Sequence, residues 1–457
     1  MKTLSLVLVP GVLLLAAGAA SAGVTIHVPQ DFPTVQEAID SAVETDIIMI
    51  SNGQYRENLV VATPGITLKG TGKDVFIDGA YLGSCLEVTA DDVTIMGIIF
   101  ANGGPPVDGG GTGGGTEGTE TGSGGVLITG AGALVTKCEF RANVDFGLKL
   151  VGTGEVVDNL IVATLVGPGL VLDSGDSAGP LTTVKSNEIV RNASGVEALK
   201  GPFLFDKNTI GNNTGDGLSV SILTADGAGP GSDPTQITKN KLFGNGATAL
   251  LLVDELGSTT LIDKNNIDEN GTGMNLTADG ITVSKNDIDQ SLLVGAWLQV
   301  SNMTWDSNKM RRSTIAGAVI STAPGVTDGN NTFTDSHFQT SGGDGAIVQS
   351  SLNVFDDCLF SDNQGDGFSI VGGVAGNQVL SSQSRDNFHD GFDNSGTDTL
   401  FTDNKSKDNL GADLAGIGDG TGTVDAASAG NTVSDESGLE AEQELELDTL
   451  ATLPTEP

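Results

Sequence analysis

The sequence predicts an all-β protein, a single-domain parallel β-helix in which the chain winds through one short coil after another. Three observations support this: a motif that recurs along most of the chain, alternating apolar residues within each motif, and an Asn at a fixed place in it. The motif is plainest in "DKNTIGNNTGDGLSV" (206–220), "DKNNIDENGTGMNL" (263–276) and "DDCLFSDNQGDGFSI" (356–370). A period of roughly 20 to 50 residues indicates a solenoid, because each unit buries its interior only against its neighbours.

The chain begins with a predicted secretory signal peptide, residues 1–22. Lys2 precedes an apolar run over 4–20, and the small residues of 20–22 form a cleavage site before Gly23. No later apolar run reaches the roughly 18 residues that a membrane span needs. We therefore expect an exported protein, secreted or periplasmic, with no membrane span.

A short amphipathic helix is expected within 33–43, "PTVQEAIDSAV". Thr34 and Glu37 have the spacing of a capping box. The apolar residues are spaced to share one helical face, and they are Val35, Ala38, Ile39, Ala42 and Val43. We expect this helix to cap the first coil.

Each repeat is registered on a small residue, usually Gly, that precedes an apolar–any–apolar triplet, and the commonest spacing is 22 residues. The register comprises Gly125, Gly147, Gly169, Gly195, Gly217, Ala249, Gly273, Gly295, Gly317, Gly345, Gly367, Gly391 and Gly411. Apolar residues stand three before and two after a central residue, and a second small polar residue stands five after it. The central residue is Asn187, Asn208, Asn240, Asn265, Asn286 or Asn308, with Ser336, Cys358 and Gln383 as variants.

Three alternating runs per unit leave no room for a helix and predict three short strands per coil. Units that stack in parallel place equivalent residues about 4.8 Å apart. The central Asn side chains are then expected to point inward, each amide bonding the next.

Two segments are expected to lie outside the coils. Residues 102–124 are rich in Gly, with too few apolar residues to supply a core, which indicates a loop insertion. Residues 431–457 form an acidic C-terminal tail, which is predicted to be disordered. The β-helix is therefore expected to span 23–430.

The composition limits the partners. The chain has 59 Asp and Glu against 21 Lys and Arg, for a net charge of −38. Such a protein repels nucleic acid and anionic lipid, and it attracts cations. The three cysteines, Cys85, Cys138 and Cys358, are too few and too scattered for a disulfide framework.

The stretch "TIHVPQDFPTVQEAIDSAVETDIIMISNGQYRENLVVATPGITLKGTG" (25–72) resembles the start of secreted right-handed parallel β-helix proteins of the pectin-lyase-like superfamily. It is also similar to the opening of pectin methylesterases and of periplasmic copper-accessory β-helix proteins. The later coils resemble the generic repeat of that superfamily. The resemblance implies a right-handed β-helix, a fold that hosts lyases, glycosidases, esterases, epimerases, adhesins and inert spikes.

Most catalytic signatures of these relatives are not found in the chain. The downstream Gln and Asp motifs of pectin methylesterases and the strand motifs of polysaccharide lyases do not occur. Copper handling needs clustered soft ligands, whereas His27, His337 and His389 lie far apart and the six Met do not cluster.

The candidate catalytic group is a file of carboxylates. Asp344, Asp366 and Asp390 directly precede the register Gly in three successive coils, with His389 beside the last. "NQGDG" (363–367) resembles the Asn-Thr-Asp-Gly element of polygalacturonase-like glycosidases, which implies acid and base roles for these residues. The Asp doublet, Gly-His-Gly and Arg-x-Lys of that family do not occur.

The same three carboxylates are the candidate ligands for calcium, which prefers oxygen donors. The simpler interpretation is turn chemistry, since Asp216 occupies the same position alone.

Trp297 is the candidate ligand-contact residue. In "GAWLQV" (295–300) the strand alternation sends it outward between two inward residues, whereas Trp305 falls at an inward position. Its row across the coils is Leu251, Asn275, Trp297, Val319 and Ile347. An exposed ring with an apolar stripe is a platform for a sugar or for a partner face.

A file of lysines directly precedes the central Asn in four consecutive coils, at Lys207, Lys239, Lys264 and Lys285. In so acidic a protein, such a file could hold an anionic glycan. The alternative is local pairing with Asp206 and Asp263.

Two functional hypotheses follow. The first is an exported protein that binds or processes polysaccharide along the side of the solenoid, as a lyase or glycoside hydrolase if it is an enzyme. The second is a non-catalytic surface, matrix or adhesion rod. A periplasmic copper-accessory role is a third alternative.

Overall fold

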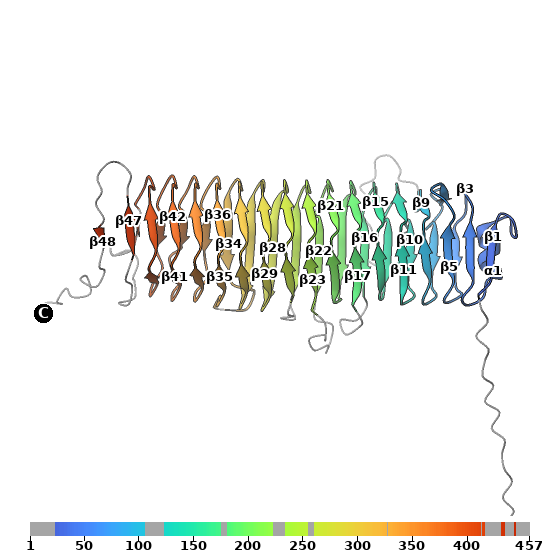
Figure 1. The fold of residues 1–457 in the computed structure, drawn as a ribbon, viewed down its shortest axis with the longest axis horizontal. Coiled ribbons are helices and arrows are strands. Elements are labelled where there is room, and N and C mark those ends of the chain that lie inside the picture. The colour runs from blue at the N-terminus through green and yellow to red at the C-terminus, as the bar shows by residue number, and fades with distance from the viewer. Residues whose placement is uncertain are drawn as a thin grey trace, which may run out of the picture.

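The protein is a long rod of stacked coils (Figure 1). The computed structural model describes residues 23–105, 123–174, 181–222, 234–254, 260–326, 328–412, 414–415, 431–434 and 443–444. The predicted signal peptide, most of the predicted Gly-rich loop and most of the acidic tail lie outside these residues. The described strands form three parallel sheets, here called A, B and C, and the chain runs from A to B to C in each coil.

Sheet A has 16 strands. They are β1 (Thr25–Val28), β2 (Ile47–Ile50), β5 (Thr67–Gly70), β8 (Thr94–Met96), β11 (Ala133–Thr136), β14 (Gly154–Val157), β17 (Thr182–Lys185), β20 (Phe203–Asp206), β23 (Gln236–Thr238), β26 (Leu261–Asp263), β29 (Thr282–Ser284), β32 (Thr304–Asp306), β35 (Thr332–Thr334), β38 (Val354–Asp356), β41 (Gln378–Leu380) and β44 (Leu400–Thr402).

Sheet B is built mostly of three-residue strands. They are β3 (Gly53–Tyr55), β6 (Val75–Asp78), β9 (Ile99–Ala101), β12 (Glu139–Arg141), β15 (Leu160–Val162), β18 (Glu188–Val190), β21 (Thr209–Gly211), β24 (Lys241–Phe243), β27 (Asn266–Asp268), β30 (Asp287–Asp289), β33 (Lys309–Arg311), β36 (His337–Gln339), β39 (Leu359–Ser361), β42 (Gln383–Arg385), β45 (Lys405–Lys407) and β47 (Thr432–Ser434). The short strand β48 (Gln443–Glu444) pairs antiparallel with β47.

Sheet C has 15 strands. They are β4 (Leu59–Val61), β7 (Leu86–Val88), β10 (Val126–Ile128), β13 (Leu148–Val151), β16 (Pro168–Asp173), β19 (Ser194–Leu199), β22 (Leu218–Ile222), β25 (Thr248–Asp254), β28 (Thr272–Asp279), β31 (Val294–Ser301), β34 (Ala316–Ser321), β37 (Ala346–Val348), β40 (Phe368–Ile370), β43 (Phe392–Asn394) and β46 (Leu414–Ala415).

Helix α1 (Val35–Ser41) forms where the sequence predicts it and lies at the N-terminal end of the rod (Figure 1). The Thr34 hydroxyl accepts a hydrogen bond from the backbone N–H of Glu37, and Val35, Ala38 and Ile39 are buried. Val43 was expected on the buried face but is exposed, because the helix ends at Ser41. That α1 caps the core stays a prediction.

The core is one continuous column of apolar side chains inside the three sheets. Aromatic rings stack from coil to coil, with the Phe333 and Phe355 ring centroids 4.5 Å apart and those of Phe338 and Phe360 5.1 Å apart. These are the residues that the alternation assigns to the interior. The inward period-2 pattern is therefore confirmed.

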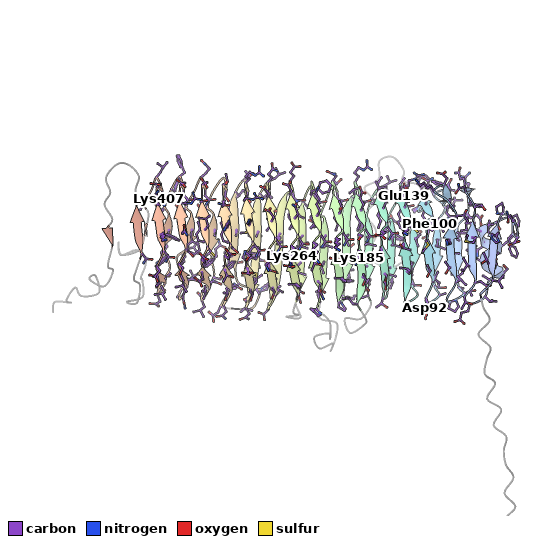
Figure 2. The ribbon with its side chains drawn as sticks, viewed as in Figure 1. Asp92, Phe100, Glu139, Lys185, Lys264 and Lys407 are labelled. Carbon is purple, nitrogen blue, oxygen red and sulfur yellow. The ribbon has the colours of Figure 1, made fainter. Side chains whose placement is uncertain are left out.

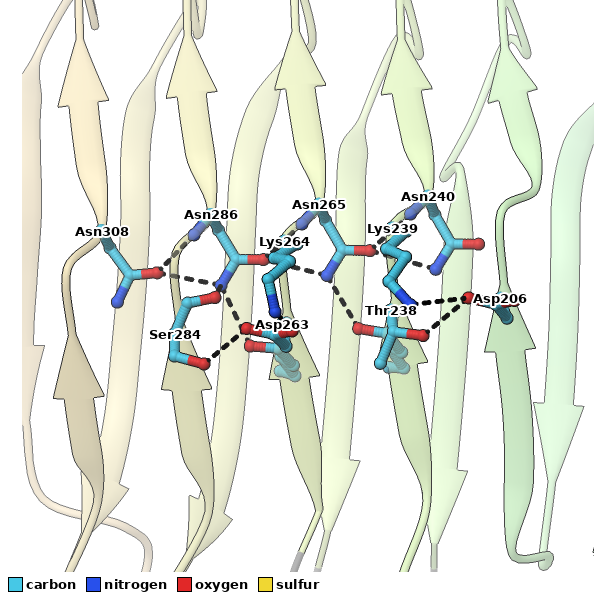
Figure 3. Close-up of polar contacts among 12 residues, drawn as sticks. Asp206, Thr238, Lys239, Asn240, Asp263, Lys264, Asn265, Ser284, Asn286 and Asn308 are labelled. Carbon is cyan, nitrogen blue, oxygen red and sulfur yellow. Dashed lines mark hydrogen bonds and ion pairs between the residues drawn. The ribbon is translucent and has the colours of Figure 1, made fainter.

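The predicted Asn ladder is confirmed between sheets A and B (Figure 3). The Asn265 side-chain nitrogen donates to Asn286 Oδ1 at 2.9 Å, and Asn240 donates to Asn265 Oδ1 at 3.0 Å. Gln383 was predicted at this position, but the ladder residue is Ser382, whose hydroxyl accepts from the Cys358 backbone N–H at 3.1 Å. Val379 and Leu380 are both apolar, so either could be the residue three before the centre, and the position two after it is polar in both registers.

The last residue of the predicted register was also misplaced. Phe392, which directly follows Gly391, pairs with Leu414, so Gly411 is not in register with Gly391. Gly411 belongs to the preceding turn, where its backbone N–H donates to the His389 carbonyl at 2.9 Å.

Further Asn ladders bond neighbouring coils at the other two corners. Between sheets B and C, Asn213 donates to Asn245 Oδ1 at 2.9 Å. Between sheets C and A, a ladder that the sequence reasoning missed joins Asn331, Asn353 and Asn377, with side-chain bonds of 2.9 and 3.0 Å. A buried amide that both donates and accepts, as that of Asn353 does, stiffens the rod, because it is satisfied only in the correct stack.

Candidate functional site

Trp297 lies on the outer face of sheet C, as predicted. It sits in β31 between the buried residues Ala296 and Leu298, and 42% of it is exposed. Its neighbours in the adjoining strands are Asn275 and Val319. Trp305, in the next strand of the chain, is fully buried with its ring 6.1 Å from that of Phe333.

Polar side chains stand beside this ring in the next outward row of sheet C. Gln299 follows Trp297 by two residues and pairs with Thr277 and Ser321 in the adjoining strands. The Thr277 hydroxyl lies 3.1 Å from Gln299 Oε1, and the Ser321 hydroxyl donates to the Leu298 carbonyl at 3.2 Å. The sequence reasoning missed this row, although the same alternation, read two residues further along each strand, identifies it.

The apolar stripe beside Trp297 is less exposed than the sequence predicts. Val319 is only 6% exposed and packs with Val294 and Ala316 in a small cluster separate from the main core, with Ile347 against it. The alternation gives the face of a residue but not what covers it. Trp297 is therefore well exposed, while its apolar neighbour Val319 is nearly buried.

Large apolar residues are exposed in the turns that lead into β31 and β34. They are Leu292, Leu293 and Ile315. The Leu293 carbonyl accepts a hydrogen bond from the backbone N–H of Ile315 at 2.9 Å, so the last two lie above one another in successive coils. The sequence reasoning did not single out these residues, because turns carry no alternation.

The structure brings the predicted carboxylate file together as a hydrogen-bonded chain at the start of sheet C. Asp344 Oδ1 accepts the backbone N–H of Asp366 at 2.9 Å, and Asp366 Oδ1 accepts that of Asp390 at 2.9 Å. Asp216 does the same for the backbone N–H of Thr248 at 2.8 Å. Each carboxylate therefore has a structural role, because it forms a hydrogen bond from its own coil to the next.

Two of these carboxyl groups are half-buried, and burial raises the pKa of both. Burial raises the pKa of Asp344, while the backbone N–H of Asp366 and the nearby His389 lower it. Burial also raises the pKa of Asp366, and the charges of Asp344 and Asp390 add to that rise. A raised pKa favours the protonated form of a carboxyl, the form in which it can act as a general acid.

The metal readings have little direct support in the described part of the chain. Within it, no three His, Cys, Asp or Glu side chains meet where they could hold a metal ion. Calcium at Asp344, Asp366 and Asp390 stays a prediction.

Most described soft donors are poorly placed for copper, although His27 of β1 and the half-buried Met49 of β2 are neighbours in sheet A. Burial raises the pKa of Cys85, Cys138 and Cys358 to about 12, so the thiolates that bind copper are disfavoured. Met274, Met303 and Met310 are buried in the core.

The predicted lysine file lies at the bend between sheets A and B, and Figure 2 labels one of its members, Lys264. All four lysines have left-handed backbone, with φ of 58° at Lys207, 56° at Lys239, 57° at Lys264 and 55° at Lys285. Lys264 Nζ is 2.6 Å from Asp263 Oδ2, and Lys239 Nζ is 3.9 Å from Asp206 Oδ1 (Figure 3). Local pairing with these two acids, the predicted alternative, is therefore present.

The candidate residues fall on two different sides of the solenoid. Trp297 and the carboxylate file both belong to sheet C, while the lysine file belongs to the bend between the other two sheets. A shallow groove of about 610 Å³ crosses that bend in the N-terminal half, between Lys73, Lys137, Glu139, Asp158 and Glu188. The groove contains none of the candidate residues.

Comparisons with known proteins fit this architecture. The family described as "Right handed beta helix region" matches residues 278–435, and "Periplasmic copper-binding protein (NosD)" matches 112–322. No curated protein matches the chain. In the described residues, no helix has the length and apolar character to span a membrane.

Solved structures with a related backbone include the periplasmic alginate epimerase AlgG, pectate lyase Pel9A and the Dettilon tailspike protein. AlgG is 10% identical over 90% of this chain and 83% of its own, with a TM-score of 0.33. Pel9A is 13% identical over 65% and 73%, with a TM-score of 0.40. The tailspike is 15% identical over 74% and 66%, with a TM-score of 0.43. Likeness at this level carries no information about activity. Three parallel sheets, stacked Asn and the β-helix family match together identify the chain as a right-handed parallel β-helix.

Proposed function

We propose that this is an exported protein that binds polysaccharide on the outer face of sheet C, around Trp297. The observation that carries the proposal is the exposed ring of Trp297 on a flat strand face, with amide and hydroxyl side chains beside it. Export is supported by the predicted signal peptide and by a partial match to a family named as periplasmic.

The chemistry of this face suits a sugar. The C–H side of a pyranose ring stacks on an aromatic ring, and its hydroxyls need neighbouring donors and acceptors. Trp297 supplies the first, while Asn275, Gln299 and Thr277 supply the second from the same and the preceding strand. The ring needs little rearrangement to bind, because its strand is held on both sides.

Processing of the bound polysaccharide is a second candidate, favoured by the carboxylate file. Asp344 begins the sheet C strand two coils beyond Trp297, so both lie on one side of the rod. Asp344 and Asp366 have raised pKa values, with burial as the first cause, and His389 is near both. Acid and base carboxyls of this kind hydrolyse glycosidic bonds.

The test is a polysaccharide panel scored for retention of the protein and for new reducing or unsaturated ends. Trp297→Ala is expected to lose retention while it melts like the parent, because the ring is outside the core. Trp305→Phe, a change of the buried Trp, is the matched control and should retain binding.

Retention without new ends would identify a binding protein, and new ends that disappear in Asp366→Asn would identify an enzyme. Absence of both retention and new ends across the panel would leave the non-catalytic rod as the better reading and contradict the proposal.

A further inference from the structure

An uncharged strip runs along sheet C through Trp297. The first outward row is uncharged from Ser219 in β22 to Ser369 in β40, and the second row from Ser221 to Val371. Glu197 and Asp393 stand in the first row directly beyond its two ends. We call these two rows, between those two acids, the uncharged strip.

The lack of charge is particular to this face. In the same coils, the outward rows of sheet B carry Lys241, Asp287, Lys309 and Arg311. The chain as a whole has 59 acidic and 21 basic residues. In a chain with so many charged residues, an uncharged strip indicates that the ligand of this surface is uncharged.

The strip has no cation with which to hold an anionic ligand. Its strands, β22, β25, β28, β31, β34, β37 and β40, are all described, and none contains Lys or Arg. Carboxylate and sulfate groups on a glycan are bound by Arg or Lys, or through a bound cation. The charges that border the strip, such as Asp216, Asp344 and Asp366, are acidic, and without bound calcium they repel such a glycan.

Its polar groups are those that recognise neutral hydroxyls. The Thr277 hydroxyl is taken by the Gln299 carbonyl oxygen at 3.1 Å, so the Gln299 amide N–H groups are left to donate to a ligand. Asn275 is half-buried beside Trp297 and offers both a donor and an acceptor.

The strip is also long and narrow enough to hold an extended glycan chain along the rod axis. Its strands run across the rod and lie about 4.8 Å apart, so seven of them give a path of about 30 Å along the axis. A pyranose unit of an extended glycan has a length similar to one such step. Successive sugars would therefore meet successive strands, with one of them over Trp297.

We infer that the ligand of sheet C is a neutral polysaccharide, without carboxylate or sulfate, lying along the rod axis on the uncharged strip. This inference rests on the proposed polysaccharide binding and specifies its substrate class. The strip excludes uronate polymers by charge and selects neutral ones by ring stacking and amide contacts.

The first experiment compares neutral β-glucan, xylan and mannan with alginate and polygalacturonate, by affinity electrophoresis of the full chain. We expect retention by at least one neutral polymer and by neither anionic one. Retention should change less than twofold between low salt and about 1 M salt, where charge interactions are screened.

The second experiment uses the two tryptophans as reporters. In Trp305→Phe, Trp297 is the single remaining Trp, so oligosaccharides of the retained polymer should shift its emission. In Trp297→Ala, the remaining Trp305 is buried, and we expect no shift and a loss of affinity of tenfold or more.

The third experiment adds charge to the strip. Asn275→Lys should weaken neutral binding and create salt-sensitive retention by alginate. Asn266→Lys, the same change in the same coil on the outer face of sheet B, is the matched control and should do neither.

Retention by alginate or polygalacturonate alone would overturn the inference but leave polysaccharide binding intact. Retention by no polymer would contradict both. Concentration-dependent dimerisation that Trp297→Ala abolishes, without glycan binding, would assign the strip to a second copy of the chain and overturn the inference as well.

Discussion

The Asp344 carboxylate accepts the backbone N–H of Asp366 from the next coil at 2.9 Å, and it does so while half-buried. The hydrogen bond needs only an oxygen acceptor, whereas the negative charge carries a desolvation cost. The structural and the electrostatic roles of this residue can therefore be separated by substitution.

Asp344→Asn is expected to raise the melting temperature near pH 7. Burial raises the folded pKa of Asp344 above its ordinary value, so ionisation destabilises the fold at pH values above that folded pKa. The advantage of Asn should shrink as the pH falls through the folded pKa towards 3.8 and disappear below it. Thermal melts of both proteins across this pH range measure the effect.

Asp344→Ala is the control for that experiment. It removes the acceptor of the Asp366 N–H as well as the charge, so it should be less stable than Asp344→Asn at every pH. An Asn variant that is destabilised as much as the Ala variant would show that the charge itself is required.

Asn265→Ala should destabilise the rod strongly. It removes Oδ1 as the acceptor of the Asn240 backbone and side-chain N–H groups, and it leaves the Ile237 carbonyl without its donor (Figure 3). Each buried group left unsatisfied costs about 1–3 kcal/mol. Chemical denaturation of the parent and the variant measures the loss.

Two further variants make the Asn265 result specific. Asn265→Ser should cost less, because Ser336 occupies the same ladder, accepts from Asn308 at 3.1 Å and donates to the Thr334 carbonyl at 2.8 Å. Asn266→Ala, one residue away and exposed, should be near neutral. Equal losses at the two neighbouring positions would show that the ladder is not the cause.

Trp305→Ala is expected to cost about 3–5 kcal/mol of unfolding free energy, as for other large core truncations. The side chain is fully buried and begins an aromatic column that continues through Phe333 and Phe355. Trp305→Phe should cost less, since it keeps a ring in the column and removes a buried indole N–H that has no described partner. A larger loss for Phe than for Ala would contradict this packing.

Calcium binding by the carboxylate file is expected to be weak, at about millimolar concentration, with oxygen ligands. Calcium should then raise the melting temperature more than magnesium at equal ionic strength, because Ca²⁺ accepts irregular oxygen ligands while the smaller Mg²⁺ requires a near-octahedral site. Asp366→Asn should reduce the calcium effect. Identical melts with and without calcium would leave the file with its hydrogen-bonding role alone.

The repeat by itself determined the coil, the inward residues and the stacking of Asn208, Asn265, Asn286 and Asn308, because one coil buries its interior only when the next has the same pattern. It also determined that Trp297 faces outward and Trp305 inward, since side chains alternate along a strand. Two positions were harder to place. The register slipped by one residue at Ser382, because Val379 and Leu380 are both apolar, and by two residues near Gly411, because "GADL" (411–414) has the same pattern as a register Gly and its triplet.

Only the tertiary structure decided which outward residues share a face and what covers them. The sequence shows Trp297 and the lysine file as neighbours in one repeat, but the bends place them on different sides of the rod. It shows Val319 as outward, but packing against Val294 and Ala316 buries it. The uncharged strip is likewise invisible along the chain, because its residues come from strands 22 to 32 residues apart and meet only when the coils stack.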